Sequence, residues 1–239
     1  CDGGRSAVRH AIGLQFEGDH YEQVFMLADI ELDWTLERGY GYKFARFIDG
    51  EMQGGGACIP VPGNPRRYRF STIAPEEMLP KDLTTSGKAH WASDVGPTLE
   101  EVQGTLDFLY PVGAKASNMV WSSYYRISHR IVPRYNLGRV FLAGDAAHLH
   151  PPLGGQGMNA GLQDAYNLAW KLALAVRGLA APDLLESYNV ERHAIGQQIV
   201  DRTTERMTRM LEGEIDHEEP LRDDSQLFLH YRASPWVAN

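Results

Sequence analysis

Cysteine and long hydrophobic runs are both scarce in this 239-residue chain. Cys1 and Cys58 are its only cysteines and lack the paired spacing of a metal site, so a disulfide-rich scaffold is excluded. We expect a reducing compartment, the cytoplasm, with a single disulfide as the open alternative. Since no run of about 18 apolar residues occurs, no membrane span is expected. Basic runs are missing and the net charge is −8, which argues against nucleic acid as a partner.

A glycine-rich signature is missing as well. The G-x-G-x-x-G turn that follows the first strand of a dinucleotide-binding fold does not occur anywhere in the chain. No internal repeat or low-complexity segment is visible either.

The most informative stretch runs from Gly138 to Lys171 and reads as strand, turn, loop and helix. The apolar run 140–143 predicts a strand covered on both faces, ended by Gly144-Asp145. The loop 153–157 is rich in glycine, which lets backbone approach a ligand closely. A helix follows from Met158, with Gly178 as its C-terminal cap. Its packed face is expected to consist of the apolar residues Ala165, Leu168, Ala169, Leu172 and Val176.

This arrangement predicts a type of ligand. In open α/β sheets, ligands bind beyond the carboxyl ends of the strands, and a helix N-terminus favours a negatively charged group. Asp145, at the strand end, can accept hydrogen bonds from the hydroxyl groups of a sugar or sugar alcohol. The pattern therefore favours a polyhydroxylated cofactor whose electron-rich head lies at residues 155–159.

The same stretch resembles the second FAD-binding motif of the para-hydroxybenzoate-hydroxylase-like (phenol-hydroxylase-like) aromatic monooxygenases. GRVFLAGDAAH, HPP, GGQGMN and the D-A-NL-WKL helix all match. The resemblance implies that Asp145, after Gly144, binds the ribitol of FAD. It also implies that the flavin ring meets the backbone of Gly154, Gly155, Gln156, Gly157, Met158 and Asn159. The carbonyl of Pro151 is then the catalytic candidate near the reacting position of the substrate; a rigid loop entry at Pro151-Pro152 is the alternative.

Residues 1–13, CDGGRSAVRHAIG, carry a second signature. Ser6 is a plausible N-cap and Gly13 a plausible stop of a short helix. The segment resembles the same family's (C/A)-D-G-x-x-S-x-V-R motif, which implies that Asp2, Gly3 and Arg9 lie near the FAD pyrophosphate. Family members carry this motif after a complete N-terminal Rossmann unit. We therefore expect this chain to be a fragment that binds FAD poorly by itself.

Extended segments dominate between the two motifs. Candidate strands lie at 23–32, 42–48, 54–61, 68–73 and 116–127, with turns at Asp49-Gly50 and 62–65. A helix is predicted over 98–109, with Thr98 as N-cap, and another from Pro182 to about Leu211. The resemblance implies that the sheet roofs a substrate pocket, whereas a sheet without chemistry is the alternative.

The expected fold class is α/β (an α+β mixture): a partial FAD-binding Rossmann-like domain with an inserted, mostly antiparallel β-sheet substrate domain. Residues 1–13 and 136–212 are assigned to the FAD-binding part and residues 14–135 to the substrate domain. Residues 213–239 are expected to be a linker toward a further C-terminal domain.

The resemblance implies an FAD-dependent monooxygenase that hydroxylates a small aromatic, phenolic or polycyclic substrate with NAD(P)H and O₂, with a homodimer as an open possibility. The alternatives are a related flavoprotein oxidoreductase (halogenase or dehydrogenase), and a non-catalytic fragment unable to bind FAD. A metal hydrolase that uses Asp145, His148 and His150 as ligands is a third. Arg126, Arg130 and Arg134 either line an anionic cofactor or form salt bridges.

Overall fold

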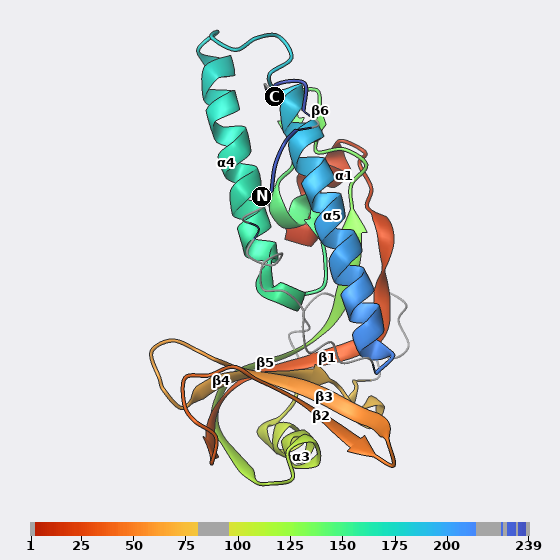
Figure 1. Ribbon diagram of the computed structural model, residues 1–239, viewed down its shortest axis with the longest axis vertical. Helices are drawn as coiled ribbons and strands as arrows, with labels where there is room; N and C mark the ends of the chain where they lie inside the picture. The colour runs from red at the N-terminus through yellow and green to blue at the C-terminus, as the bar shows by residue number, and fades with distance from the viewer. Residues whose placement is uncertain (1–2, 81–95, 214–225, 227–228, 233, 238–239) are drawn as a thin grey trace. The chain divides into compact units, whose positions relative to one another are not determined.

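The computed structural model describes residues 3–80, 96–213, 226, 229–232 and 234–237. The chain divides into two compact units, unit 1 with residues 1–19 and 128–239 and unit 2 with residues 20–127. Strands β1 (Glu17–Trp34) and β5 (Ala114–Ile131) each begin in one unit and end in the other (Figure 1). The boundaries between the two units therefore lie inside these two long strands. From the sequence, we expected the boundaries between residues 13 and 14 and between residues 135 and 136.

Unit 2 is an antiparallel sheet with one helix. Its strands lie in the order β2-β3-β4-β1-β5, where β2 is Tyr42–Ile48, β3 is Glu51–Pro60 and β4 is Arg67–Ile73. The pairs β2–β3, β3–β4 and β4–β1 are all antiparallel. Asp49 and Gly50 join β2 to β3 with φ of 53° and 85°, as a two-residue hairpin requires. The predicted strands and this turn are confirmed.

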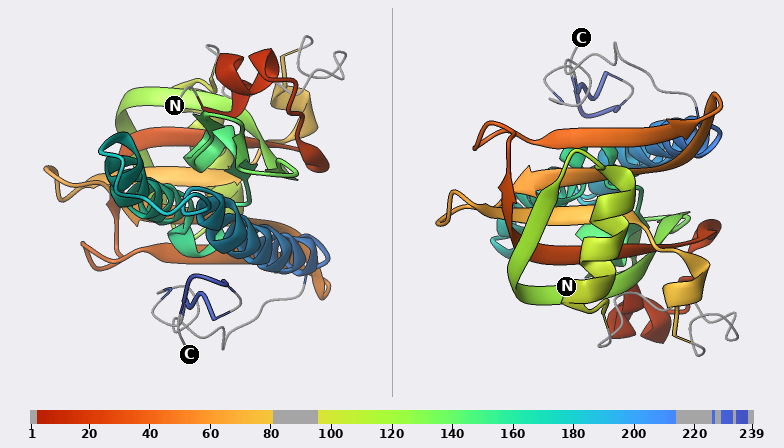
Figure 2. Two further views of the ribbon diagram at one scale, coloured as in Figure 1. Left: turned by 90° about the horizontal axis from the view of Figure 1, so that it is seen from above. Right: turned by 90° about the horizontal axis from the view of Figure 1, so that it is seen from below.

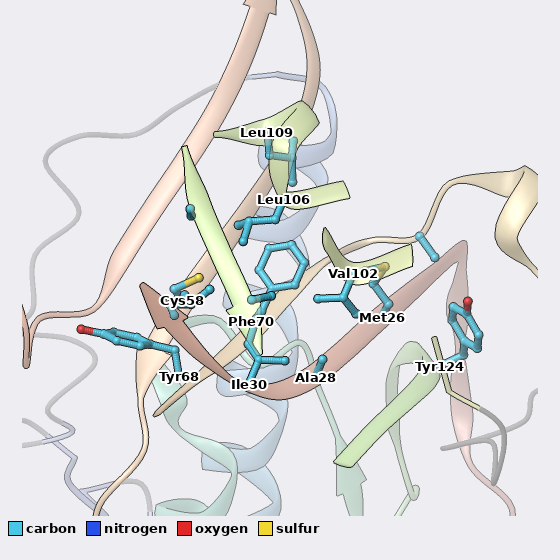
Figure 3. Packing of buried hydrophobic residues seen from close by; sticks show 14 of the residues in the cluster. Met26, Ala28, Ile30, Cys58, Tyr68, Phe70, Val102, Leu106, Leu109 and Tyr124 are labelled. Carbon is cyan, nitrogen blue, oxygen red and sulfur yellow. The ribbon is translucent and has the colours of Figure 1, made fainter. Parts of the chain in front are cut away.

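Helix α3 (Leu99–Leu109) covers one face of this sheet (Figure 2). Its start follows from the sequence, because Thr98 and Glu101 form a capping box that satisfies the first backbone N–H groups. Val102, Leu106 and Leu109 lie on one side of the helix and pack on strand residues that alternate inward (Figure 3). These inward residues include Met26, Ala28, Ile30, Cys58, Tyr68 and Phe70. A short 3₁₀ turn, η2 (Glu76–Met78), follows β4.

Unit 1 is mainly helical. It contains the 3₁₀ turn η1 (Gly3–Arg5) and the helices α1 (Ala7–Ala11), α4 (Gly157–Val176) and α5 (Glu186–Leu211), of which α4 and α5 contact each other (Figure 1). Ser6 caps α1 by accepting a hydrogen bond from Arg9 N at 2.9 Å, and Gly178 (φ 69°) follows α4, as predicted. Helix α5 begins four residues later than the predicted Pro182. Within the parts of the chain described, no helix combines the length and the apolar character needed to cross a membrane.

The strand expected at 140–143 is shorter than predicted. Only Val140–Phe141 (β7) is extended with a partner, and it pairs antiparallel with β6 (Asn136–Leu137). Gly138, with φ of 58°, reverses the chain between them. Both residues of β7 are half-buried, so the prediction of a strand covered on both faces is wrong. A third short strand, β8 (His148–Leu149), pairs with the end of β5.

The packed face of α4 also differs from the prediction. Ala165, Ala169 and Val176 are exposed, and the buried residues of the helix are Ala160, Asp164, Asn167 and Lys171. These four recur at helical spacing, so the helix buries a mostly polar stripe. Met158 and Trp170, 77% and 45% exposed, also lie outside this buried face. A pattern search for apolar residues selects the wrong side of such a helix.

Helix α5 packs closely on Tyr135, and Gly196 allows this approach. A Cβ at Gly196 would overlap the hydroxyl oxygen of Tyr135, whose fully buried ring stacks on His148 and cannot move away easily. We expect Gly196→Ala to lower the free energy of unfolding by about 1–3 kcal/mol, measured by thermal or urea denaturation.

Gly104 on α3 is the matched control, since a Cβ there meets no atom within 4 Å. Gly104→Ala should leave stability unchanged or raise it by up to about 1 kcal/mol, the difference in helix propensity. Equal effects of the two substitutions would refute the packing argument.

Candidate cofactor site

The predicted site centres on a turn that packs against α4. Residues Gly144–Ala146 form the 3₁₀ turn η3, and Gly144 adopts φ of 59°. A Cβ at Gly144 would lie 3.6 Å from the Cα of Gly161 on α4, so a side chain here would separate the turn from the helix. Asp145 is exposed, and its carboxylate is accessible to a ligand.

A buried carboxylate holds this turn in place. The backbone N–H of Gly144 donates to Asp164 Oδ2 at 3.0 Å. His148 Nε2 lies 2.8 Å from the same oxygen, and Arg192 Nε donates to Oδ1 at 2.7 Å. Burial raises the pKa of Asp164, but the hydrogen bonds from His148 and Gly144 and the charge of Arg192 outweigh it, so the pKa lies below its usual value. The turn is thus fixed to an ionised group.

The glycine-rich loop leads into the N-terminus of α4, and both include exposed residues. Gly154 and Gly155 in the 3₁₀ turn η4 (Leu153–Gly155) have φ of 76° and 64°, and both are exposed. Among the described residues, no side chain caps the N-terminus of α4. Its first backbone N–H groups can therefore bind an anionic group. Met158 and Asn159 are exposed beside them, whereas Gln156 is fully buried.

Arg9 joins the N-terminal motif to the same turn. Its Nη1 donates to the carbonyl of Ala146 at 3.2 Å and its Nη2 to the carbonyl of Gly4 at 2.8 Å. The guanidinium lies 3.9 Å from the ring centroid of Phe16, and the residue is only 2% exposed. The structure thus places Gly3 and Arg9 beside η3, but Arg9 is directed at carbonyl oxygens inside the protein. Asp2 lies outside the described residues.

Pro151 and His150 form the entry to the loop. Pro151 is buried, and its carbonyl oxygen lies 3.0 Å from His150 Nδ1. Since a carbonyl can only accept, Nδ1 carries the proton. His150 Nε2 is buried without a hydrogen-bond partner among the described residues, close to Gly157, where a Cβ would lie 3.6 Å away. Burial and neighbouring His148 lower the pKa of His150, against the opposing effects of the Pro151 carbonyl and Asp145.

This environment predicts a pH dependence. Because the folded state favours the neutral ring of His150, its stabilising contribution is present above the usual histidine pKa of about 6.5. It is lost as the pH falls through the lower, folded-state pKa. NMR titration should give a pKa for His150 below 6.5, and His150→Gln should reduce the loss of stability on acidification from about pH 7 to 5. A titration at or above 6.5 would contradict the buried neutral ring.

The metal alternative finds no support in this geometry. His148 Nε2 is directed at Asp164 and not at Asp145. Over the described residues, no group of three or more His, Cys, Asp or Glu side chains is arranged to hold a metal ion.

Two of the arginines considered as cofactor ligands lie beside acidic side chains. Arg130 Nη2 lies 3.9 Å from Asp19 Oδ1, and Arg134 Nη2 lies 3.3 Å from Glu186 Oε2.

Sequence reasoning missed the buried polar network behind the site. Lys171 Nζ donates to Glu191 Oε2 at 2.7 Å and to Asn167 Oδ1 at 2.8 Å, all from buried residues. Ser234 Oγ donates to the other carboxylate oxygen of Glu191, Oε1, at 3.0 Å. The available signal was the spacing of polar residues on α4 together with the S-Y-x-x-E-R segment of α5, which contains Glu191 and Arg192.

A helix start without a side-chain cap and an exposed carboxylate, in a chain that also forms an antiparallel sheet, are features expected of a protein with a nucleotide-type cofactor. The model of the family "FAD binding domain" matches residues 1–203, so the chain belongs to this family. The predicted family resemblance is thereby confirmed, as is the mixed α/β class with a mostly antiparallel sheet.

Named relatives agree with this assignment. The chain is 36% identical over 203 residues to rifampicin monooxygenase of Streptomyces venezuelae, covering 85% of this chain and 39% of the relative. It is 37% identical over 213 residues to 3-hydroxybenzoate 4-monooxygenase of Comamonas testosteroni, covering 84% and 31%. The flavin-dependent monooxygenase PieE, solved with FAD and substrate, matches with a TM-score of 0.63 and 26% identity over 95% of this chain and 38% of that one. The chain thus spans about two fifths or less of these relatives.

Proposed function

We propose that this protein is an FAD-dependent monooxygenase that hydroxylates an aromatic substrate, with NAD(P)H and O₂ as co-substrates. The observation that carries the proposal is that the η3 turn, which contains exposed Asp145, packs on α4, whose N-terminus has no side-chain cap. Membership of the FAD-binding family and the monooxygenase names of the relatives support it.

The residues present fit FAD in three respects. Asp145 offers exposed carboxylate oxygens to the hydroxyl groups of the ribitol. The backbone N–H groups at Gly157–Asn159 begin α4 without a side-chain cap, beside the exposed Met158 and Asn159, and suit the negatively charged edge of the flavin. Glycines at 144, 154 and 155 keep side chains away from the approach. FAD, when bound, supplies the electron transfer and the oxygen chemistry.

The protein's own contribution is binding and orientation. Arg9 and Asp164 hold the η3 turn from two sides, which keeps Asp145 directed outward. Arg9 would add positive charge beneath the pyrophosphate by way of the turn, because Nη1 donates to the carbonyl of Ala146 and Nη2 to that of Gly4. Asp2 keeps its proposed role near the pyrophosphate. Pro151 is proposed to present its carbonyl near the substrate, with His150 fixing its orientation.

The substrate class and setting belong to the same proposal. A small phenolic or polycyclic aromatic compound is supported by the named reactions of the relatives. We also propose a cytoplasmic location, as the low cysteine content suggests, and a homodimer.

The test is to purify the natural full-length protein, record its intact mass and visible spectrum, and screen phenols and polycyclic aromatics. NAD(P)H oxidation, hydrogen peroxide and hydroxylated product should be followed together. Bound flavin with product formed in proportion to NAD(P)H consumed is the expected result. Flavin with NAD(P)H oxidation but no hydroxylated product would indicate another flavoprotein oxidoreductase, and a folded protein without flavin would indicate a non-catalytic one.

A further inference from the structure

The glycine-rich loop 153–157, here called the cofactor loop, is supported by hydrogen bonds to the buried side chain of Gln156. Gln156 lies between the glycines of η4 and the first residue of α4, at the N-cap position, yet its side chain makes no capping hydrogen bond. It points inward instead and is fully buried. A buried amide at this position indicates that the loop is held from beneath, because exposed glycines cannot fix it by side-chain packing.

Two donors from different segments meet the amide oxygen of Gln156. Arg202 Nη2, from α5, donates to Gln156 Oε1 at 3.0 Å. Gln226 Nε2, from the segment after α5, donates to the same oxygen at 3.1 Å. Gln226 in turn accepts a hydrogen bond from Gln163 of α4. Helix α5 also contacts η4 directly, so both the loop and its central side chain are supported by the same helix.

We propose that Arg202 is a positioning residue for the cofactor. By holding Gln156, it fixes the backbone N–H groups at the start of α4 in the orientation that binds the anionic edge of FAD. This inference rests on the proposed function for the identity of the ligand, but not for the loop geometry. Its physical basis is that a hydrogen bond from a charged donor to a buried carbonyl is stronger than one from a neutral donor. The guanidinium also adds positive charge behind a site for an anion.

The experiment compares Arg202→Met with Arg202→Lys and with Arg209→Met in the natural full-length protein. Arg209 lies on the same helix and forms an ion pair with the exposed Glu205 at 3.8 Å, so it controls for loss of an arginine from α5. Hydrogen exchange of the amides of residues 155–159 is measured in apo-protein, and FAD affinity is measured by titration. In Arg202→Met, exchange should be about tenfold faster and FAD binding about tenfold weaker, as expected for loss of roughly one charge-assisted hydrogen bond.

The conservative variant Arg202→Lys distinguishes a role of Arg202 in positioning the loop from a role in folding. Arg202→Lys keeps the charge and one donor, so it should recover most of the affinity, and the flavin of Arg202→Met should become harder to reduce. Gln226→Ala removes only the neutral donor and should shift exchange in the same direction by a smaller factor, which keeps the test valid if Arg202→Met does not fold.

Unchanged exchange at 155–159 in both Arg202→Met and Gln226→Ala, or equal weakening of FAD binding by Arg209→Met, would overturn the inference. Failure of the proposed function is recognised separately, because wild-type protein would then not bind FAD, while hydrogen exchange would still report the support of the loop.

Discussion

Asp164→Ala is expected to lower the free energy of unfolding by about 3–5 kcal/mol, the usual result of removing one partner from a buried ion pair. Asp164 is fully buried and accepts hydrogen bonds from Arg192 and from the backbone of Gly144, with His148 at 2.8 Å. Without the carboxylate, the Arg192 guanidinium stays buried beside a cavity. Urea denaturation measures the effect.

Asp183→Ala is the matched control for this substitution, because Asp183 is exposed. It should change stability by no more than about 0.5 kcal/mol. Asp164→Asn keeps the shape and one acceptor but loses the charge, so it should fall between alanine and wild type. A similar small effect of Asp164→Ala and Asp183→Ala would show that the network does not stabilise the unit.

The Asp164 carboxylate also makes folding stability depend on pH, and the direction of its pKa shift fixes the direction of this dependence. Its pKa is lower in the folded than in the unfolded state, so its contribution to stability is complete above the unfolded value of about 3.9. The contribution is lost as the pH falls through the folded-state pKa. Wild-type protein should therefore lose stability below about pH 4 more steeply than Asp164→Ala does.

Asp145→Ala is expected to weaken FAD binding by about ten- to hundredfold, which corresponds to about 1.5–3 kcal/mol for hydrogen bonds to a charged group. Because the Asp145 side chain is exposed, folding stability should stay close to wild type. Titration of apo-protein with FAD measures the affinity, and thermal unfolding without FAD provides the comparison.

Asp145→Asn tests the chemistry of this contact. The amide keeps one oxygen that accepts from a hydroxyl but has no charge, so its affinity should lie between those of wild type and Asp145→Ala. If Asp145→Ala binds FAD as tightly as wild type, the carboxylate does not hold the cofactor. If instead it melts much earlier without FAD, its role is structural.

Much of the fold was predictable because the relevant interactions are local. Ser6 and Thr98 accept from backbone N–H groups three residues ahead, and Asp49-Gly50 supplies the positive φ of a two-residue turn. The hairpins of unit 2 followed from alternating residues on either side of such turns. The candidate site residues could be selected from the sequence as well, because Asp145 and the glycine-rich loop occur in one continuous stretch.

The packing behind the site was not predictable in this way. The residues that secure η3 come from distant parts of the chain: Arg9 lies 137 positions from Ala146, and Asp164 lies 28 positions from Arg192. The predicted apolar face of α4 was wrong because Asp164 and its polar neighbours are buried through these contacts. The predicted strand at 140–143 is shorter because its partner, β6, pairs with it over only two residues.

By itself, then, the sequence determined the family, the caps and turns, and which residues are the candidates for contact with a cofactor. Only the tertiary structure decided which polar groups are buried and what holds the cofactor loop. The physical reason is that a buried charge is tolerated only with its partner in place, and that partner is supplied by another segment of the chain. The spacing of residues within α4 does not reveal that Arg192 pairs with Asp164. Likewise, the sequence of the glycine-rich loop does not reveal that Arg202 contacts Gln156.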